Sequence, residues 1–324
     1  MKAPAFWQDR QAPAGRLLEP FGWLYGAATR WRLAHAHPWR APIPVICVGN
    51  LTAGGTGKTP IVRDLSARLL AKGRRPHILS RGHGGSAKGP IQVDRERHGA
   101  ADVGDEPLLL ARDAPCWIAA DRAAGARAIV AAGGDVVLMD DGLQNPTLAQ
   151  NLKILVVDGE TGFGNGRLLP AGPLREAISE GLARADAIVV MGEDRANIVS
   201  AISGSTPIFQ AALESPLAGE LAGRKLMGFA GIGRPEKFRL TLADTGADVV
   251  AFRAFADHKP YTERVLEGLI AEAAKAGAAL VTTEKDWIRL PAAWRERIRA
   301  IPVAVRWRDE SAINCLIAQA TARG

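Results

Sequence analysis

The stretch at residues 49–60, "GNLTAGGTGKTP", carries residue types that bind phosphate groups. A phosphate-binding loop has a glycine, four variable residues and then Gly-Lys-Ser/Thr, and Gly57, Lys58 and Thr59 supply that ending. Thr52 stands where the first glycine is usual. In such a loop the backbone N–H groups cradle phosphates, the lysine reaches the β- and γ-phosphates, and the hydroxyl binds Mg²⁺. The stretch predicts a nucleoside triphosphate site.

The segments on either side of this loop fit the motif. The run "IPVICVGN" before it is apolar and rich in β-branched residues, which predicts a buried strand. The run "KTPIVRDLSARLLAKG" after it has helical spacing and ends at Gly73. A strand, a glycine loop and a helix are the context that a phosphate loop requires. The alternative is an ordinary glycine-rich turn between a strand and a helix.

A second motif, "DVVLMDDG" at residues 135–142, is an apolar strand that ends in two carboxylates, Asp140 and Asp141. Nucleotide-binding loops are paired with such an aspartate, which holds the metal ion. In open α/β sheets, ligands bind at the carboxyl ends of the strands. The same letters could form a surface turn, but together with the loop they favour a nucleoside triphosphate enzyme.

Composition bounds the class of protein. The chain has 324 residues, 47% hydrophobic and 23% charged, which is enough for two domains with a globular core. The net charge is +7, which favours an anionic partner. No long Lys/Arg tract or RNA-binding motif supports nucleic acid, and no run of 18 apolar residues or signal-peptide core is present. The three scattered cysteines form no disulfide framework or metal spacing.

The first forty residues contain an amphipathic pattern that is rich in aromatic residues and arginines. Apolar residues recur at helical spacing and mark one face of a predicted helix: Leu17, Phe21, Leu24, Ala28 and Trp31. Further aromatic residues and arginines crowd the same segment, a combination that suits a bilayer interface with anionic head groups. The alternative is a helix packed on the protein's own core, and the pattern alone leaves both open.

A transferase also needs groups that handle the acceptor's proton and the phosphate charge. Candidates are Asp105 and Glu106 in "GDEP", Arg122 in "ADR" and His258 in "FADHKPYT". A regulatory GTPase is disfavoured, because the nearest guanine-binding string is "TTEKD" at residues 282–286, which lacks the required residue between lysine and aspartate.

Taken in order, these strings resemble the tetraacyldisaccharide 4'-kinase family of the lipid A pathway of Gram-negative bacteria. The resemblance covers most of the chain and rests on "LLEPFGWLYG", "VICVGNLTAGGTGKTP", "ILSRGHGG", "VGDEPLLLA", "DRAAGA", "VVLMDDGLQ", "LLPAGPLRE", "FADHKPYT" and "VTTEKD". The threonine at position 52 is the family's own form of the loop. Asn145, Leu143 and Lys259 depart from the usual histidine, phenylalanine and histidine of the family.

The resemblance implies ATP as the phosphate donor and Mg²⁺ as the metal. The ATP phosphates would be bound by Thr52, Ala53, Gly54, Gly55, Thr56, Gly57, Lys58 and Thr59. Asp105 and His258 would form a catalytic pair that deprotonates the sugar 4'-hydroxyl, with Lys58 on the phosphates. Thr59, Glu106 and Asp141 would hold Mg²⁺. Substrate or phosphate contacts would come from Asp140, Arg122, Gln144, Arg167 and Arg175.

The family's acceptor is an acylated disaccharide 1-phosphate in the inner membrane, whereas ATP is cytoplasmic. The resemblance therefore favours membrane contact by the N-terminal segment and places the enzyme on the cytoplasmic face of the inner membrane. It implies neither nucleic acid nor an obligate protein partner. Two rival functions remain: a soluble sugar or metabolite kinase that ignores acyl chains, and an NTPase that drives partner assembly, although the scattered cysteines argue against metal delivery.

We expect an α/β fold: a P-loop NTPase-like, mostly parallel sheet, a second, smaller α/β domain and an N-terminal amphipathic helix. The predicted domains are residues 1–40 (membrane-associating helix), 41–215 (nucleotide-binding kinase domain) and 216–324 (C-terminal α/β domain), with a boundary near 214–223. Further strands of the first domain are predicted at "RPHILS", "PCWIAA", "KILVVD" and "DAIVVM". Those of the second are predicted at "RKLMGFAGIG", "ADVVAFRAF", "AALVTTEKD" and "IPVAVRW".

Overall fold

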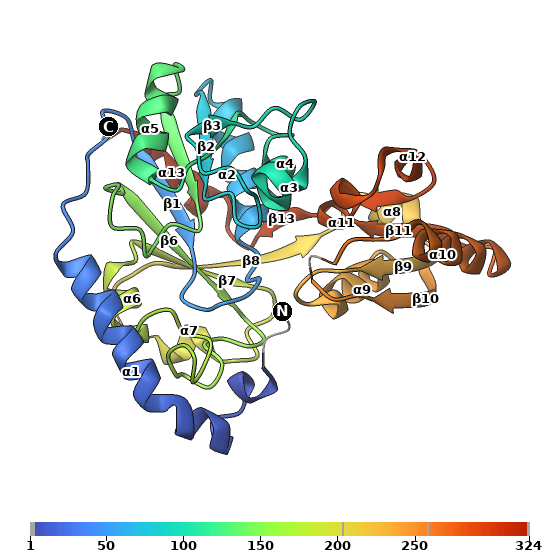
Figure 1. Cartoon of the computed structure of the whole chain (residues 1–324), viewed down its shortest axis with the longest axis horizontal. Helices are drawn as coiled ribbons and strands as arrows, with labels where there is room; N and C mark the ends of the chain where they lie inside the picture. Colours follow the sequence, from blue (N-terminus) through green and yellow to red (C-terminus); the bar gives the residue numbers. More distant parts are fainter. Residues whose placement is uncertain (1–3, 203, 258, 323–324) are drawn as a thin grey trace. The chain divides into compact units, whose positions relative to one another are not determined.

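The computed structural model describes residues 4–202, 204–257 and 259–322 (Figure 1). His258, a predicted catalytic residue, lies outside these ranges. The chain forms two compact units, each with its own sheet. The smaller unit covers Leu213–Arg306, and the larger unit runs up to Ala212 and resumes at Trp307.

The larger unit contains a nine-stranded sheet in the order β13-β8-β7-β6-β1-β5-β2-β4-β3. From β8 to β4 the neighbouring strands are parallel, and β3 pairs antiparallel with β4. Strands such as β1 are buried at every position, as expected when both faces of a parallel sheet are covered. The strands are β1 (Val45–Gly49), β2 (Pro76–Ser80), β3 (Ile91–Gln92), β4 (Cys116–Ile118), β5 (Val136–Asp140), β6 (Leu152–Asp158), β7 (Ala187–Met191), β8 (Ile208–Glu214) and β13 (Ala304–Trp307).

Helices and connecting segments surround this sheet. Helix α2 packs on β2 and β5 and buries Ile61, Leu65 and Leu69, the positions that gave the predicted helical spacing. The other helices are η1 (Ala5–Gln8), α1 (Pro13–Ala34), α2 itself (Lys58–Ala71), α3 (Ala100–Val103), α4 (Asp105–Leu110), α5 (Arg122–Ala131), α6 (Ile178–Arg184), α7 (Ile198–Ala201) and α13 (Glu310–Ala322).

The smaller unit is a four-stranded parallel sheet in the order β10-β9-β11-β12. Its apolar core includes Met227, Phe229 and Leu266, which are buried. The strands are β9 (Lys225–Ala230), β10 (Asp248–Ala254), β11 (Ala279–Thr283) and β12 (Arg299–Ile301). The helices are α8 (Ala218–Leu221), α9 (Pro235–Asp244), α10 (Glu263–Lys275), α11 (Glu284–Arg289) and α12 (Ala292–Arg295).

The predicted fold class is confirmed: the chain is α/β with a large, mostly parallel sheet, a second, smaller sheet and an N-terminal helix. One predicted strand differs. The run "IPVAVRW" does not form a single strand of the smaller sheet, because β12 ends before Pro302, which has no N–H to donate. The chain resumes as β13 in the larger sheet, where Trp307 is buried and its Nε1 donates to Asp64 at 2.8 Å. The domain division at residues 40 and 215 stays a prediction.

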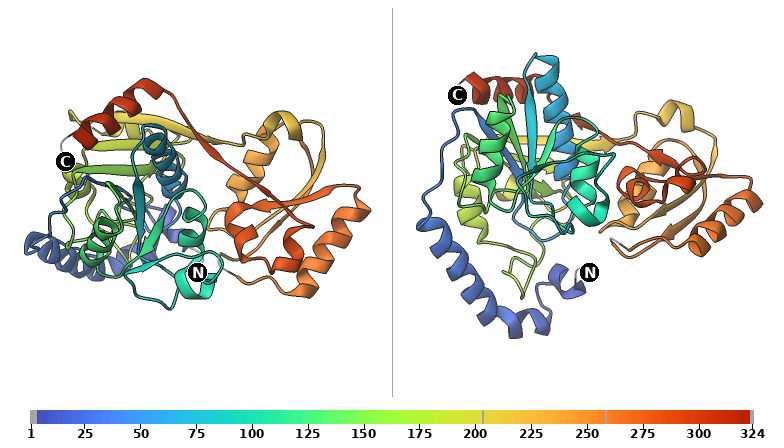
Figure 2. Two further views of the ribbon diagram at one scale, coloured as in Figure 1. Left: turned by 90° about the horizontal axis from the view of Figure 1, so that it is seen from above. Right: turned by 45° about the horizontal axis from the view of Figure 1, so that its top comes forward.

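Helix α1 lies along one edge of the larger unit, beside α6 (Figures 1 and 2). It packs inward through small residues, since Gly15, Gly22, Gly26 and Thr29 are its buried positions. The predicted apolar face points away from the protein: Leu17 is 78% exposed, Phe21 59%, Leu24 69% and Trp31 66%. The docking face and the apolar face of α1 are therefore different faces. Among the described residues, no helix is long and apolar enough to span a bilayer.

Candidate active site

The phosphate-binding loop follows β1, at the carboxyl edge of the sheet, and ends where α2 begins with Lys58. Gly57 precedes the helix with φ 89°, a left-handed conformation that favours glycine. A Cβ built on Gly54 or Gly55 would meet no atom within 4 Å, so space lies open beside this backbone. A helix N-terminus behind an accessible glycine backbone is the arrangement that binds anionic phosphates.

The first half of the loop is held from one side by residues 173–175. Thr52 forms an antiparallel bridge with Leu174, and the Ala53 N–H donates to the Pro173 carbonyl at 2.7 Å. On the other side the buried Asn50 side chain donates to the Thr52 carbonyl at 2.8 Å. The loop is thus fixed before any ligand binds, which reduces the entropy cost of binding.

Asp140 and Asp141 lie beside this loop because β5, which they end, is the parallel neighbour of β1. Lys58 Nζ is 3.7 Å from Asp141 Oδ1, and Arg175 Nη1 donates to both oxygens of Asp141 at 2.9 Å. Burial would raise the pKa of Asp141, but Lys58 and Arg175 together hold it below its ordinary value. Asp141 is therefore a carboxylate in contact with two cations.

The pKa of Asp140 is shifted in the opposite direction from that of Asp141. Its side chain is buried, and burial, with a further contribution from the Glu106 carboxylate, raises the pKa of Asp140 to about 8. Three buried oxygens in and beside the loop have no hydrogen-bond partner among the described residues: Asn50 Oδ1, Thr56 Oγ1 and Asp140 Oδ1. Buried polar atoms in native proteins normally have partners, so these oxygens are available to a polar ligand, an ion or a water molecule.

The acidic pair Asp105 and Glu106 begins α4. The turn before it requires Gly104, because φ is 91° and a Cβ there would lie 2.4 Å from the His83 carbonyl oxygen. Asp105 is buried, and Glu106 contributes to the electrostatics of Asp140. The strings "GDEP" and "MDD" therefore lie close enough that, besides burial, the Glu106 carboxylate raises the pKa of Asp140. The structure describes no group of three His, Cys, Asp or Glu residues arranged as a complete metal site.

Four further predicted residues have contacts of their own. Arg122 is buried at the start of α5, and its Nη1 donates to the carbonyls of Ala119 and Ala120. Gln144 Nε2 donates to the Asn50 carbonyl at 2.9 Å and to Glu176 at 2.8 Å, so Gln144 supports the base of the loop. The other two residues are Arg175 and Arg167. Arg175 binds Asp141, as described above, whereas Arg167 binds the N-terminal segment.

Arg167 contacts Glu19 of α1 at 3.5 Å and donates to the Arg10 carbonyl at 2.9 Å. The structure thus joins it to α1 and not to the loop. Asn145, a departure from the family pattern, has a local role: its Oδ1 accepts from the N–H groups of Thr147 and Leu148 and shapes the turn after Gln144.

Two buried residues that support the loop were missed by sequence reasoning: Asn50 and Glu176. Glu176 is 1% exposed, accepts from Gln144 and is paired with Arg184. The sequence signal for both was their position, since Asn50 directly precedes the loop and Glu176 ends the string "LLPAGPLRE". That string contains both the segment that pairs with the loop and the segment that receives α1.

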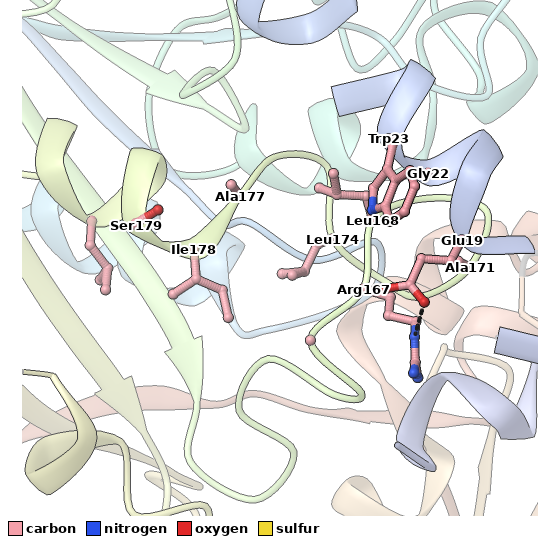
Figure 3. A pocket seen from close by; sticks show the side chains of 12 residues that line it. Glu19, Gly22, Trp23, Arg167, Leu168, Ala171, Leu174, Ala177, Ile178 and Ser179 are labelled. Carbon is pink, nitrogen blue, oxygen red and sulfur yellow. Dashed lines mark ion pairs between the residues drawn. The ribbon is translucent and has the colours of Figure 1, made fainter. Parts of the chain in front are cut away.

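A cavity of about 510 Å³ lies between α1 and residues 166–182 (Figure 3). Its lining is largely apolar and includes Trp23, Leu168, Leu174, Ile178 and Leu182. The Glu19–Arg167 ion pair is also part of the lining. Leu174 is the residue that pairs with Thr52, so one wall of the cavity is also the support of the phosphate loop.

The fold and this site define a P-loop protein, with Lys58 at the start of α2 and the strand-end aspartate Asp141 beside it. A family model described as "Tetraacyldisaccharide-1-P 4'-kinase" matches residues 14–322. The chain therefore belongs to the tetraacyldisaccharide 4'-kinase family, as its motifs indicated.

Curated relatives and a solved structure agree with this assignment. A tetraacyldisaccharide 4'-kinase from Rhodospirillum centenum is 53% identical, over 98% of this chain and 96% of the relative. One from Gluconacetobacter diazotrophicus is 52% identical, over 98% of this chain and 97% of the relative. The fold is similar to the crystal structure of LpxK from Aquifex aeolicus in complex with ATP, with a TM-score of 0.77 and 29% identity over 95% of this chain and 99% of that one.

Proposed function

We propose that this chain transfers the γ-phosphoryl group of ATP to the 4'-hydroxyl of a tetraacyldisaccharide 1-phosphate, in lipid A biosynthesis. Family membership supports the reaction class and the ATP-bound relative supports the donor. The observation in the structure that carries the proposal is the cluster at the end of β1 and β5. There Lys58 and Arg175 surround Asp141, and buried oxygens lack partners beside an open glycine backbone.

ATP would lie on residues 52–59, with its phosphates on the backbone N–H groups and on Lys58. The positive end of α2 and the Lys58 ammonium stabilise the charge that spreads over the transferred group. The acceptor oxygen forms its bond to the γ-phosphorus as the bond from that phosphorus to the β–γ bridging oxygen breaks, and ADP leaves. Arg175 lies on the segment that supports the loop and donates to Asp141, and it would contact phosphate oxygens if that ion pair opened.

An alcohol is a poor nucleophile at neutral pH, so the acceptor hydroxyl must lose its proton as it attacks. We assign the proton to the Asp105 carboxylate, with His258 as its partner in the working enzyme. Asp105 is buried at the start of α4, which suits a base that must be held in one orientation. His258 belongs to the sequence of the smaller unit, so the assignment requires both units for catalysis.

The residues present fit Mg²⁺. Magnesium takes oxygen ligands, keeps several waters and is bound in kinases by one or two carboxylates together with the substrate's phosphates. Asp141 and Glu106, with the Thr59 hydroxyl, would hold it, and the orphaned Asp140 oxygen would orient a water or the substrate there. When bound, the ion neutralises the charge of the phosphates. Burial and, after it, the neighbouring Glu106 carboxylate raise the pKa of Asp140, and a cation bound beside it would oppose that rise.

We further propose that α1 associates with the cytoplasmic face of the inner membrane, where an acylated substrate resides. Its exposed face, with Leu17, Leu24 and Trp31, has no partner among the described residues that would cover it. Aromatic residues and arginines on such a face suit a bilayer interface. The apolar cavity behind α1 adds hydrophobic surface next to the loop. In this proposal residues 1–40 would bind the membrane, residues 41–215 would bind the nucleotide, and residues 216–324 would supply His258.

The test is phosphate transfer from γ-labelled ATP, with Mg²⁺, to tetraacyldisaccharide 1-phosphate in detergent micelles. Asp105→Asn and His258→Ala should each lower transfer by about 10²–10⁴-fold, the range of general-base catalysis, with ATP still bound. His98→Ala, outside the site, is the control. A soluble sugar kinase would phosphorylate an unacylated acceptor equally well. An assembly NTPase would hydrolyse ATP without labelling any lipid, and either result would replace the proposal.

A further inference from the structure

The peptide groups of a phosphate-binding loop must be oriented, because N–H groups attract phosphate oxygens whereas carbonyl oxygens repel them. Asn50, which directly follows β1, is only 1% exposed and contacts the loop from within the larger unit. Its Nδ2 donates to the Thr52 carbonyl at 2.8 Å and to the Gly54 carbonyl at 3.3 Å. One buried side chain therefore binds two carbonyl groups of the loop.

The orientation of the Asn50 amide follows from these contacts. Only the NH₂ group of an asparagine can donate to a carbonyl, so the exchanged amide would turn Oδ1 toward two acceptors. The main chain around Asn50 is also held in place. Gln144 Nε2 donates to the Asn50 carbonyl at 2.9 Å, and the Arg175 N–H donates to the carbonyl of the next residue, Leu51, at 2.7 Å. The amide donor is thus fixed at the base of the loop.

The peptide group between Thr52 and Ala53 is held on both sides. In a trans peptide group the C=O of one residue and the N–H of the next point in opposite directions. The Thr52 carbonyl accepts from Asn50. On the opposite side, the Ala53 N–H donates to the Pro173 carbonyl at 2.7 Å. The Ala53 N–H is therefore engaged within the protein.

The peptide group between Gly54 and Gly55 is held on one side only. Its carbonyl accepts from Asn50, so its N–H points away from Asn50. No residue that the structure describes accepts from the Gly55 N–H, and a Cβ built on Gly55 would meet no atom within 4 Å. Gly54 has φ 134°, a conformation that side chains other than glycine rarely adopt. The contact with Asn50 thus leaves the Gly55 N–H available to a phosphate oxygen.

We propose that Asn50 is a positioning residue for nucleotide binding: its amide holds the Thr52 and Gly54 carbonyls away from the phosphates and thereby presents the Gly55 N–H to them. The inference rests on the proposed binding of ATP by this loop. Glycine adopts positive and negative φ about equally well, so without the amide the peptide between Gly54 and Gly55 is able to rotate. A phosphate would then lose a donor and meet a carbonyl oxygen in its place.

The test is Asn50→Ala, which removes the donor and adds no charge, with Asn165→Ala as the matched control. Asn165 is also buried, and its Nδ2 also donates to two main-chain carbonyls, those of Phe6 and Ala171, but these carbonyls lie outside the loop. The measurements are the Kd for ATP with Mg²⁺ and the melting temperature without nucleotide. We expect ATP to bind Asn50→Ala about 10- to 100-fold more weakly than Asn165→Ala, the loss of one hydrogen bond to a charged group, at similar melting temperatures.

A second variant, Asn50→Asp, separates the donor from the packing of the side chain. An ionised carboxylate is about as large as the amide but has no hydrogen to donate. The Kd for ATP should therefore rise at least as much as in Asn50→Ala, while the KM for the lipid acceptor stays unchanged. If both Asn50 variants bind ATP within threefold of Asn165→Ala, Asn50 has only a structural role and the inference is wrong.

Lys58→Ala in the same titration distinguishes this inference from the proposed function. If Lys58→Ala loses ATP binding while the Asn50 variants keep it, only the positioning role of Asn50 is overturned. If Lys58→Ala binds ATP as tightly as the wild type, the loop is not the nucleotide site, and the proposed function is overturned together with the inference.

Discussion

Glycines in the phosphate loop and glycines in α1 leave space for different occupants. A Cβ on Gly54 or Gly55 would meet no atom within 4 Å, so the loop leaves room that the described chain does not fill. In α1 the room is filled by the protein itself. A Cβ on Gly26 would lie 2.5 Å from Leu168 Cδ1, and one on Gly22 would lie 3.1 Å from the Leu168 carbonyl oxygen. The loop is built to receive a ligand, and the docking face of α1 is built to contact its own unit.

One segment supports both regions. Leu168 receives α1, and six residues later Leu174 pairs with Thr52 of the loop while also lining the cavity behind α1. Substitutions in the two regions should nevertheless have different effects on catalysis and stability. Changes in the loop should alter catalysis at constant stability, and changes on the docking face of α1 should alter stability at constant catalysis.

Among substitutions in these two regions, the largest effect is expected for Lys58→Ala. This change removes the ammonium that begins α2 beside Asp141, while Arg175 still pairs with that carboxylate. Loss of one preorganised charge at a transferring phosphoryl group costs about 10²–10³-fold in kcat. Phosphate transfer to the lipid is the measurement. Lys72→Ala, at the other end of the same helix, should keep full activity. If the kcat of Lys58→Ala were within fivefold of the wild-type value, the loop would not contribute to catalysis as proposed.

The second-largest effect is expected on the exposed face of α1 and concerns membrane binding. Leu24→Asp places a charge at a position that is 69% exposed, so the fold should not change, but an apolar contact with the bilayer would be lost. Burying a leucine is worth about 1.5–3 kcal/mol, which corresponds to roughly ten- to hundredfold weaker binding to anionic vesicles in a flotation assay. Leu70→Asp is the matched control, since Leu70 is an exposed leucine on α2. An equal loss of vesicle binding in both variants would show that α1 does not mediate membrane binding in particular.

Gly55→Ala should show the function of the open space in the loop. Because the backbone of Gly55 is not left-handed and no atom is near, the added methyl group should leave the melting temperature unchanged. It would stand where phosphate oxygens approach, and we expect the KM for ATP to rise about tenfold, or about 1.4 kcal/mol. Gly219→Ala adds a methyl group in equally open space in α8 and should change neither quantity. An unchanged KM in Gly55→Ala would mean that ATP does not approach this backbone.

Much of this organisation could be predicted from sequence, because its signals are local. The apolar run before the loop, the helical spacing after it and the strand-end pair Asp140 and Asp141 each follow from a few consecutive residues. Parallel pairing of β1 with β5 then brings these parts together. The apolar face of α1 could be predicted from its period for the same reason.

Contacts between distant parts of the chain could not be predicted in the same way. Nothing in the sequence around Arg167 distinguishes it from Arg175, yet one binds Glu19 and the other binds Asp141. The segment between them contacts both α1, through Leu168, and the loop, through Leu174. Likewise, β13 follows β12 after only two residues but belongs to the larger sheet, because the buried Trp307 has its hydrogen-bond partner, Asp64, on α2.

The smallest effect is expected on the docking face of α1, where Gly26→Leu would force the helix and Leu168 apart. Overpacking costs about 1–3 kcal/mol, but the end of a leucine side chain can move and leucine favours a helix more than glycine, so a net loss of about 1 kcal/mol is expected. In a unit of this size that lowers the melting temperature by about 2–4 °C. The neighbouring Ala27→Leu, on an exposed position, should lower it less. If Gly26→Leu instead raised the KM for ATP at constant melting temperature, residues 168–174 would couple α1 to the loop, and the separation of the two regions would be wrong.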